Sequence, residues 1–483
     1  MIWRTLVLLH RYLGVASGAL MLTWFASGIV MLYMPYPGLS GKERMAILEP
    51  LGWHACCRSP AVPIPGDQPI ERAEVESVAG TLALRLTLPG RSESLISLDA
   101  SESEVPLDLP HSRATAVAAA RRLGLTAFEP STQETIVRDQ WTVSGEYNAD
   151  RPLTRFGFSD AEHTQIYVSA TNGRVVLHTT ARQRFWNRLG AVPHWLYPTI
   201  LRSHPRLWAQ VVVWTSLVGV FLTTIGLYLG VVQYQLRGKR VLSPYAGIWN
   251  WHHSLGLLFG IFTLSWVASG LVSMNPWGFL DSGPGVQPTP EARSVTWGEV
   301  RASLVRIAQS PAVPNAVNLV TAPFSGELFW IATGPDGVQK RLDAGGGVHS
   351  MTPADLQAAA QHAAGPAGVD SATLLEQEDA YYYGHHHPAV LPVLRVIVND
   401  RDHTRLYLDP LSGRLMEQFD RNGRWQRWLF DGLHRLDFSV LLRASAIWNG
   451  LVVVLLAGGV ALSATGTYLA VRRVFRDIAR LRR

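Results

Sequence analysis

Four apolar stretches, each long enough to cross a bilayer, constrain this chain more than any other feature of its sequence. They cover about residues 6–33, 208–232, 255–274 and 447–471. A helix needs roughly 20 apolar residues to span the hydrocarbon core. The first stretch is long enough for a secretory signal, with residues 26–28 as its cleavage region. Because the same Ala-Ser-Gly triplet recurs inside the third stretch, at residues 268–270, we predict four transmembrane helices instead.

The basic residues near the ends of these stretches predict the orientation of the protein. They lie before the first stretch, between the second and third, and after the fourth: Arg4, Arg237, Lys239, Arg240, Arg472, Arg473, Arg476, Arg480, Arg482 and Arg483. All of these positions share one side in a four-span topology, and basic loops stay in the cytoplasm. The net charge of +6 therefore indicates membrane orientation and not a nucleic-acid partner. Both termini are expected in the cytoplasm of a multi-pass protein in a bacterial inner membrane.

This topology divides the chain into eight parts. We predict transmembrane helices over residues 1–34, 208–236, 248–276 and 447–472, periplasmic domains over 35–207 and 277–446 that each end in an interfacial segment, a cytoplasmic loop over 237–247 and a basic cytoplasmic tail over 473–483.

An internal repeat relates the two halves of the sequence. A shift of 242 relates one set of identical residues: His10, Leu13, Gly14, Trp24 and residues 26–28 to His252, Leu255, Gly256, Trp266 and residues 268–270. A shift of 240 relates a second set: His194, Leu196, Leu201, Trp208, Gly219, Gly226 and Tyr228 to His434, Leu436, Leu441, Trp448, Gly459, Gly466 and Tyr468. Between the helices, the same shift of 240 relates five more identical residues: His163, Thr164, Tyr167, Gly173 and Arg174 to His403, Thr404, Tyr407, Gly413 and Arg414. Because both copies run in the same direction, we expect a tandem repeat with an axis along the membrane normal.

Each outer segment has the pattern of an α+β domain. Ser112 and Thr352 are expected to cap helices that contain three consecutive alanines. A strand over residues 164–169 or 404–409 follows each helix, and then a turn with Gly173 or Gly413 leads to another strand. Residues 41–70 and 281–295 are rich in Pro and Gly and are expected to be linkers or loops.

Four histidines that form two pairs of repeat mates are the main candidates for chemistry. His10 and His252 lie at the cytoplasmic ends of helices one and three, and His194 and His434 lie just before helices two and four. Under two-fold symmetry, the members of each pair face each other, as the axial ligands of a b-type haem do. Cofactor sites in helix bundles form between such facing helices. The alternative is that each histidine packs at an interface and binds a backbone carbonyl or a lipid headgroup.

Glycines follow both members of the pair His10 and His252 at helical spacing. His10, Gly14 and Gly18 lie four residues apart, as do His252, Gly256 and Gly260. They leave room for a flat macrocycle, although the same spacing forms helix-packing seams in membranes. Four arginines are candidates for pairing with haem propionates or for anchoring the protein at the membrane surface: Arg11, Arg202, Arg435 and Arg443. His253 could replace His252 as a ligand, and His204 is a weaker candidate.

Two further groups have no counterpart in the other half. His385, His386 and His387 form a short tract of a kind that binds metals, or a solvated loop. Cys56 and Cys57 face an oxidising compartment in this topology, and a strained disulfide, a metal-binding pair and free thiols all stay open. We find no nucleotide-binding glycine loop, zinc-protease motif or nucleophile elbow.

The outer segments resemble the small PepSY domain, and the second half resembles the PepSY-associated transmembrane family. Residues 381–383, 391–396, 404–414 and 433–438 carry the second resemblance, which extends over nearly the whole chain. It implies an iron-regulated membrane protein similar to ferric-siderophore reductases.

The haem sites and this resemblance together lead to one expected function. The protein would pass electrons from a quinol or a cytoplasmic reductant, through two b-type haems, to a ferric siderophore at the periplasmic face. One alternative is a peptide-binding or protease-regulating sensor with structural histidines. A second is an iron-chelate permease, for which a homodimer would supply eight spans.

Overall fold

The computed structural model describes residues 2–53, 56, 64–98, 105–237, 240–283, 285–288, 293–384, 389–438 and 446–482, with the backbone alone for 235–237 and 240–242. Within this part of the chain, four helices are long and apolar enough to cross a membrane. They are α1 (Ile2–Tyr33), α7 (Pro205–Gln233), α8 (Ile248–Ser273) and α14 (Ala446–Leu481). The four predicted spans are thereby confirmed as helices, and each helix is longer than its apolar stretch.

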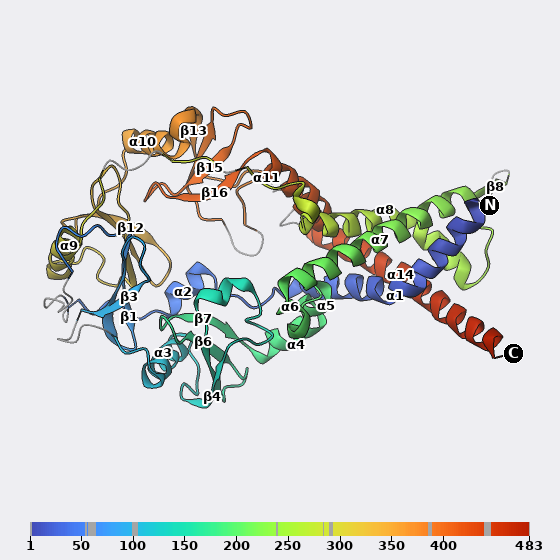
Figure 1. Ribbon diagram of the computed structural model, residues 1–483, viewed down its shortest axis with the longest axis horizontal. Helices are drawn as coiled ribbons and strands as arrows, with labels where there is room; N and C mark the ends of the chain where they lie inside the picture. The colour runs from blue at the N-terminus through green and yellow to red at the C-terminus, as the bar shows by residue number, and fades with distance from the viewer. Residues whose placement is uncertain are drawn as a thin grey trace.

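The four long helices form one bundle in which each helix packs against two others. α1 and α8 both contact α7 and α14. The bundle core contains Met21, Phe25, Leu222, Trp266, Val267, Val452, Leu455 and Leu456. The two chain termini and the β8–β9 hairpin (Gln235–Arg237 and Arg240–Leu242) lie at one end of the bundle, and the larger sheets lie beyond the other end (Figure 1). The described loop and terminal segments that carry the basic residues of the orientation argument therefore share one end.

Two four-stranded antiparallel sheets, one from each half of the chain, lie beyond the end of the bundle that is opposite the termini (Figure 1). The first has the order β4 (Pro130–Ile136), β5 (Leu153–Phe158), β6 (Gln165–Ser169) and β7 (Val175–Thr179); the second has the order β13 (Val369–Leu375), β14 (Val393–Val398), β15 (Arg405–Leu408) and β16 (Leu415–Phe419). Helix α3 (Leu109–Arg122) packs on the first sheet and α10 (Pro353–Ala364) on the second. Buried alanines of both helices, among them Ala120 and Ala360, allow this close packing.

The helix caps agree with the sequence analysis in one of the two domains. Thr352 caps α10, where it forms a capping box with Asp355. The prediction for Ser112 is wrong, because Asp108 caps α3 and accepts the backbone N–H of His111. Ser112 lies inside that helix and is buried.

A third sheet joins the two outer segments, and the sequence analysis did not predict it. Its six strands have the order β12 (Gln339–Asp343), β11 (Phe329–Thr333), β10 (Asn318–Thr321), β1 (Arg72–Val78), β2 (Thr81–Thr87) and β3 (Ser94–Ser97). β1 of the first segment pairs antiparallel with β10 of the second, with Val75 opposite Leu319. Helix α9 (Trp297–Gln309) covers this sheet, and Trp297 and Trp330 lie in its core.

Short helices connect the sheets to the bundle. In the first half these are α4 (Ala181–Leu189), α5 (Ala191–His194) and α6 (Thr199–Arg202); in the second half they are α11 (Arg421–Gln426), a π-helical turn (Arg427–Gly432) and α12 (Leu433–Arg435). Helix α2 (Gly41–Ile47) lies within residues 41–70, so the expectation of a linker there is wrong for these seven residues. Ser40 and Glu43 form a capping box that starts this helix.

Candidate haem sites between the two halves

His194 on α5 and His434 on α12 face each other where the sheets meet the bundle. Their ring centroids are 6.1 Å apart and the ring planes are inclined by 68°. Nδ1 of His194 lies 3.0 Å from the carbonyl oxygen of Trp24, and Nδ1 of His434 lies 3.1 Å from that of Trp266. A carbonyl can only accept, so Nδ1 carries the proton in both rings. The lone pair of each neutral ring is therefore on Nε2, as a metal ligand requires.

His10 on α1 and His252 on α8 form a second pair inside the bundle. Their ring centroids are 6.3 Å apart and the planes are inclined by 37°. Nδ1 of His10 lies 3.1 Å from the carbonyl oxygen of Leu222, and Nδ1 of His252 lies 3.2 Å from Oγ1 of Thr465. The Thr465 hydroxyl donates to its own helix, to carbonyl oxygens at 2.8 and 3.0 Å, so it accepts from His252. The same tautomer follows for this pair.

Glycines allow both rings of the inner pair to lie close against a neighbouring helix. A Cβ at Gly226 would lie 2.6 Å from Cε1 of His10, and one at Gly466 would lie 3.0 Å from Cε1 of His252. At the outer pair the fit is looser, because a Cβ at Gly28 would lie 3.5 Å from Cε1 of His194, and one at Gly270 would lie 3.5 Å from Cε1 of His434. All four glycines belong to the internal repeat, but their contacts with the histidines were not predicted from the sequence.

The inner pair opens into a cavity of about 340 Å³ between the four long helices. Its wall includes His10, His252 and seven glycines: Gly14, Gly18, Gly226, Gly230, Gly256, Gly260 and Gly466. Gly14, Gly18, Gly256 and Gly260 thus line the space that their spacing predicted. Gly18 and Gly260 also form packing seams, because a Cβ there would lie 3.2 Å from Thr467 and 2.6 Å from Leu227.

The distances within both pairs fit a single metal ion between two imidazoles. An imidazole nitrogen binds a transition metal at about 2 Å, and the ring centre lies about 1.1 Å behind that nitrogen, which gives a centroid separation of about 6.2 Å for ligands on opposite sides. The described residues contain no group of three or more His, Cys, Asp or Glu that could hold a metal ion. Two facing histidines are also the axial ligands that a b-type haem takes from a protein.

The other candidate residues have contacts of their own within the chain. His253 has both ring nitrogens in contact with the chain, at 2.9 Å from Ser243 Oγ and 2.9 Å from the Gly230 carbonyl oxygen. Nδ1 of His204 lies 3.1 Å from the Ile200 carbonyl oxygen. Arg11 lines the inner cavity, whereas Arg435 pairs with Asp431 at 3.2 Å.

The remaining sequence candidates lie away from the pairs or outside the described residues. The guanidinium of Arg202 lies over the rings of Tyr197 and Trp208. Cys56 is disulfide-bonded. Five of the candidates lie outside the described residues: His385, His386, His387, Cys57 and Arg443.

A loop from each four-stranded sheet contacts the segment that carries the outer histidine of its half. In the first half, Nε2 of Gln140 donates to the carbonyl oxygen of Tyr197 at 2.8 Å, three residues after His194. In the second, Nε of Arg427 donates to the carbonyl oxygen of Ala380 at 2.9 Å. The outer domains therefore contact the segments that carry the outer histidines.

An aspartate fixes each of these loops to its sheet. Tyr167 donates to Asp139 and Tyr407 donates to Asp379, each at 2.8 Å, and Arg155 and Arg395 pair with the same two aspartates at 3.2 Å. Burial alone would raise the pKa of Asp379. Bonds from two backbone N–H groups, Tyr407 and Arg395 outweigh burial and lower this pKa below its ordinary value. The carboxylate is thus ionised at neutral pH and holds the loop in place.

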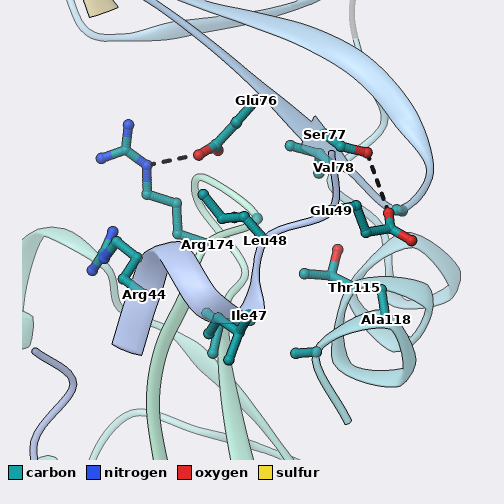
Figure 2. Close-up of a pocket in the computed structure, with 14 residues that line it drawn as sticks. Arg44, Ile47, Leu48, Glu49, Glu76, Ser77, Val78, Thr115, Ala118 and Arg174 are labelled. Atoms are coloured by element: carbon teal, nitrogen blue, oxygen red, sulfur yellow. Dashed lines mark hydrogen bonds and ion pairs between the residues drawn. The ribbon is translucent and has the colours of Figure 1, made fainter. Parts of the chain in front are cut away.

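A cluster of charges joins the first four-stranded sheet to the six-stranded sheet. Arg174 contacts Glu74, Glu76 and Glu93 there, and Arg85 contacts Glu76 and Glu93. Figure 2 shows Arg174 directed at Glu76 beside a cavity of about 30 Å³. That volume holds roughly one or two water molecules, so the cluster is a junction between sheets and not a substrate site.

No protein-family model matches the chain, and no curated protein matches it.

Proposed function

We propose that this protein is an electron-transfer protein of the bacterial inner membrane that binds two b-type haems. His10 and His252 would ligate the inner haem, and His194 and His434 the outer one. The observation that carries the proposal is the state of the four rings: each Nδ1 donates to a backbone carbonyl or a hydroxyl, and each pair has the separation expected for a shared metal.

A bis-histidine haem supplies one-electron transfer without a change of ligands. The chain supplies position, because the Nδ1 bonds fix each ring. Because each pair takes one histidine from each half, both sites depend on the packing of α1 and α7 against α8 and α14. The tandem repeat in the sequence accounts for two equivalent ligands at each site.

The direction of electron transfer and the electron acceptor are part of the same proposal. Electrons enter from a quinol or a cytoplasmic reductant at the end that holds the termini, and leave at the periplasmic domains. A ferric siderophore or another ferric chelate is the proposed acceptor, and this part depends on the resemblance to the PepSY-associated family. Reduction to Fe(II) weakens the binding of hard oxygen ligands, which would release iron in the periplasm. The contacts of Gln140 and Arg427 support the periplasmic domains as the exit site.

An optical spectrum tests the haem proposal directly. The protein is purified in detergent from cells supplied with haem, and spectra are recorded oxidised and dithionite-reduced. A Soret band with sharp reduced α and β bands, and about two haems per chain by pyridine extraction, is expected. A folded but colourless protein would contradict the proposal and favour the peptide-binding sensor.

Single substitutions then assign the two sites. His10→Ala or His252→Ala should leave only the outer haem, and His194→Ala or His434→Ala only the inner one. His253→Ala is the matched control, because His253 lines the same cavity while both of its nitrogens contact the chain. Loss of haem in His253→Ala with retention in His252→Ala would reverse the assignment. Size-exclusion profiles separate loss of haem from loss of fold.

A further inference from the structure

The last turns of α14 have the composition of a segment that binds an anionic membrane surface. α14 has 36 residues, which corresponds to about 54 Å of helix, whereas the hydrocarbon core is about 30 Å thick. In Figure 1 its C-terminal turns extend past the other three helices and away from them. The mate of this extension in the first half is absent, since α7 ends at Gln233 and the β8–β9 hairpin follows.

Apolar side chains form one face of the extension. This face consists of Val471, Val474, Phe475, Ile478 and Leu481. Successive members are one or three residues apart, which places them on one side of a helix. They are exposed in the protein: 68% of Phe475 and 88% of Leu481 are accessible. Exposed apolar side chains in water are costly, so this face requires a covering.

Basic side chains form the opposite face. Residues 471–482 contain five arginines and one acidic residue, Asp477. Arg473 and Arg476 line the mouth of the inner cavity, and Arg473 pairs with Asp477 at 2.8 Å. The basic face is thus directed toward the bundle, and the apolar face is directed away from it, where lipid surrounds a membrane protein.

We propose that residues 471–482 of α14 lie in the headgroup layer of the cytoplasmic leaflet and bind anionic phospholipid. The apolar face continues the lipid-facing surface of the same helix, and the excess of positive charge matches phosphate-rich, negatively charged headgroups. The positive charge also argues against a second copy of this helix as the covering, because two such segments repel each other. The inference does not depend on haem.

A spin label on the apolar face tests whether residues 471–482 lie in the headgroup layer. The probe is Phe475→Cys in full-length protein with Cys56→Ser and Cys57→Ser, reconstituted in phosphatidylcholine vesicles with or without about one third phosphatidylglycerol. Relaxation by oxygen reports lipid, and relaxation by a water-soluble nickel chelate reports water. The matched control is Ala479→Cys, which lies two turns after Arg472 on the basic face.

In vesicles with phosphatidylglycerol, the label at position 475 is expected to be several-fold more accessible to oxygen than to nickel, and the label at 479 to show the reverse. Arg472→Gln with Arg480→Gln, or high salt, should shift the label at 475 toward nickel. Equal nickel accessibility in both kinds of vesicle would overturn the proposal in favour of a water-exposed helix. Dipolar broadening between labels at 475 would overturn it in favour of a second copy.

Discussion

Trp266 and His434 exchange two hydrogen bonds between α8 and α12. Nδ1 of His434 donates to the carbonyl oxygen of Trp266 at 3.1 Å, and the indole Nε1 of Trp266 donates to the carbonyl oxygen of His434 at 2.7 Å. The backbone and the ring of His434 are therefore both held by one residue of the bundle. In the first half, His194 makes the corresponding ring bond to Trp24.

Trp266→Phe removes the indole donor and keeps a large ring in the core. The carbonyl oxygen of His434 loses its bond, which we expect to cost roughly 1 kcal/mol of stability and to weaken retention of the outer haem. Haem content and thermal unfolding in detergent measure both effects. Trp24→Phe is the control at the equivalent position of the first half. If both variants lose the outer haem equally, the bond from the Trp266 indole to the His434 carbonyl oxygen does not account for haem retention.

Gly226→Ala places a methyl group against the ring of His10. The Cβ would lie 2.6 Å from Cε1, so either the ring or α7 must move. We expect loss of the inner haem with retention of the outer one, measured as the haem-to-protein ratio. Gly450→Ala on α14 is the control, because its Cβ meets no atom within 4 Å. Full haem content in Gly226→Ala would show that this contact does not position His10.

The sequence predicted the membrane part of this architecture better than the outer part. Apolar length located all four long helices, because backbone hydrogen bonds in a lipid core must be satisfied within each helix. The repeat selected the histidines that the structure brings together. The pairing of Val75 with Leu319 could not be predicted, because strand pairing over more than 240 residues leaves no local pattern in the sequence.

The contacts of each candidate side chain could not be predicted from the sequence either. His252 and His253 are adjacent on one helix, and only the structure shows that Ser243 and Gly230 contact both nitrogens of His253. The capping error at Ser112 has a similar cause. Ser and Asp are both good caps, and the tertiary position of α3 decides in favour of Asp108.

Glu74→Gln should destabilise the outer domains in a pH-dependent way. Burial raises the pKa of Glu74, but Arg174, Arg72 and a bond from Asn318 outweigh burial and lower it below 4.5. The unfolded chain then binds a proton more readily than the folded protein, so this contribution is present above pH 4.5 and is lost as pH falls through the lowered pKa. At neutral pH we expect a loss of about 1–3 kcal/mol, since buried partners lose a charged acceptor.

Thermal unfolding of the variant and the natural protein from about pH 3 to about pH 8 measures this difference. Glu129→Gln is the control, because its pair with Arg113 is exposed and such pairs contribute about 0–1 kcal/mol. The difference for Glu74→Gln should shrink toward acid pH. A difference that stays constant over the whole range would mean that the ionised form of Glu74 is not the stabilising one.

The two histidine pairs should also differ in their electron paramagnetic resonance spectra. The angle between ligand ring planes governs the g anisotropy of low-spin ferric bis-histidine haem, and nearly perpendicular rings give the larger g maximum. The outer pair is inclined by 68° and the inner pair by 37°. His10→Ala, which keeps the outer haem, should therefore show a larger g maximum than His194→Ala. The reverse order would mean that haem binding reorients the rings, and that the Nδ1 bonds to Trp24, Trp266, Leu222 and Thr465 do not fix the ring planes.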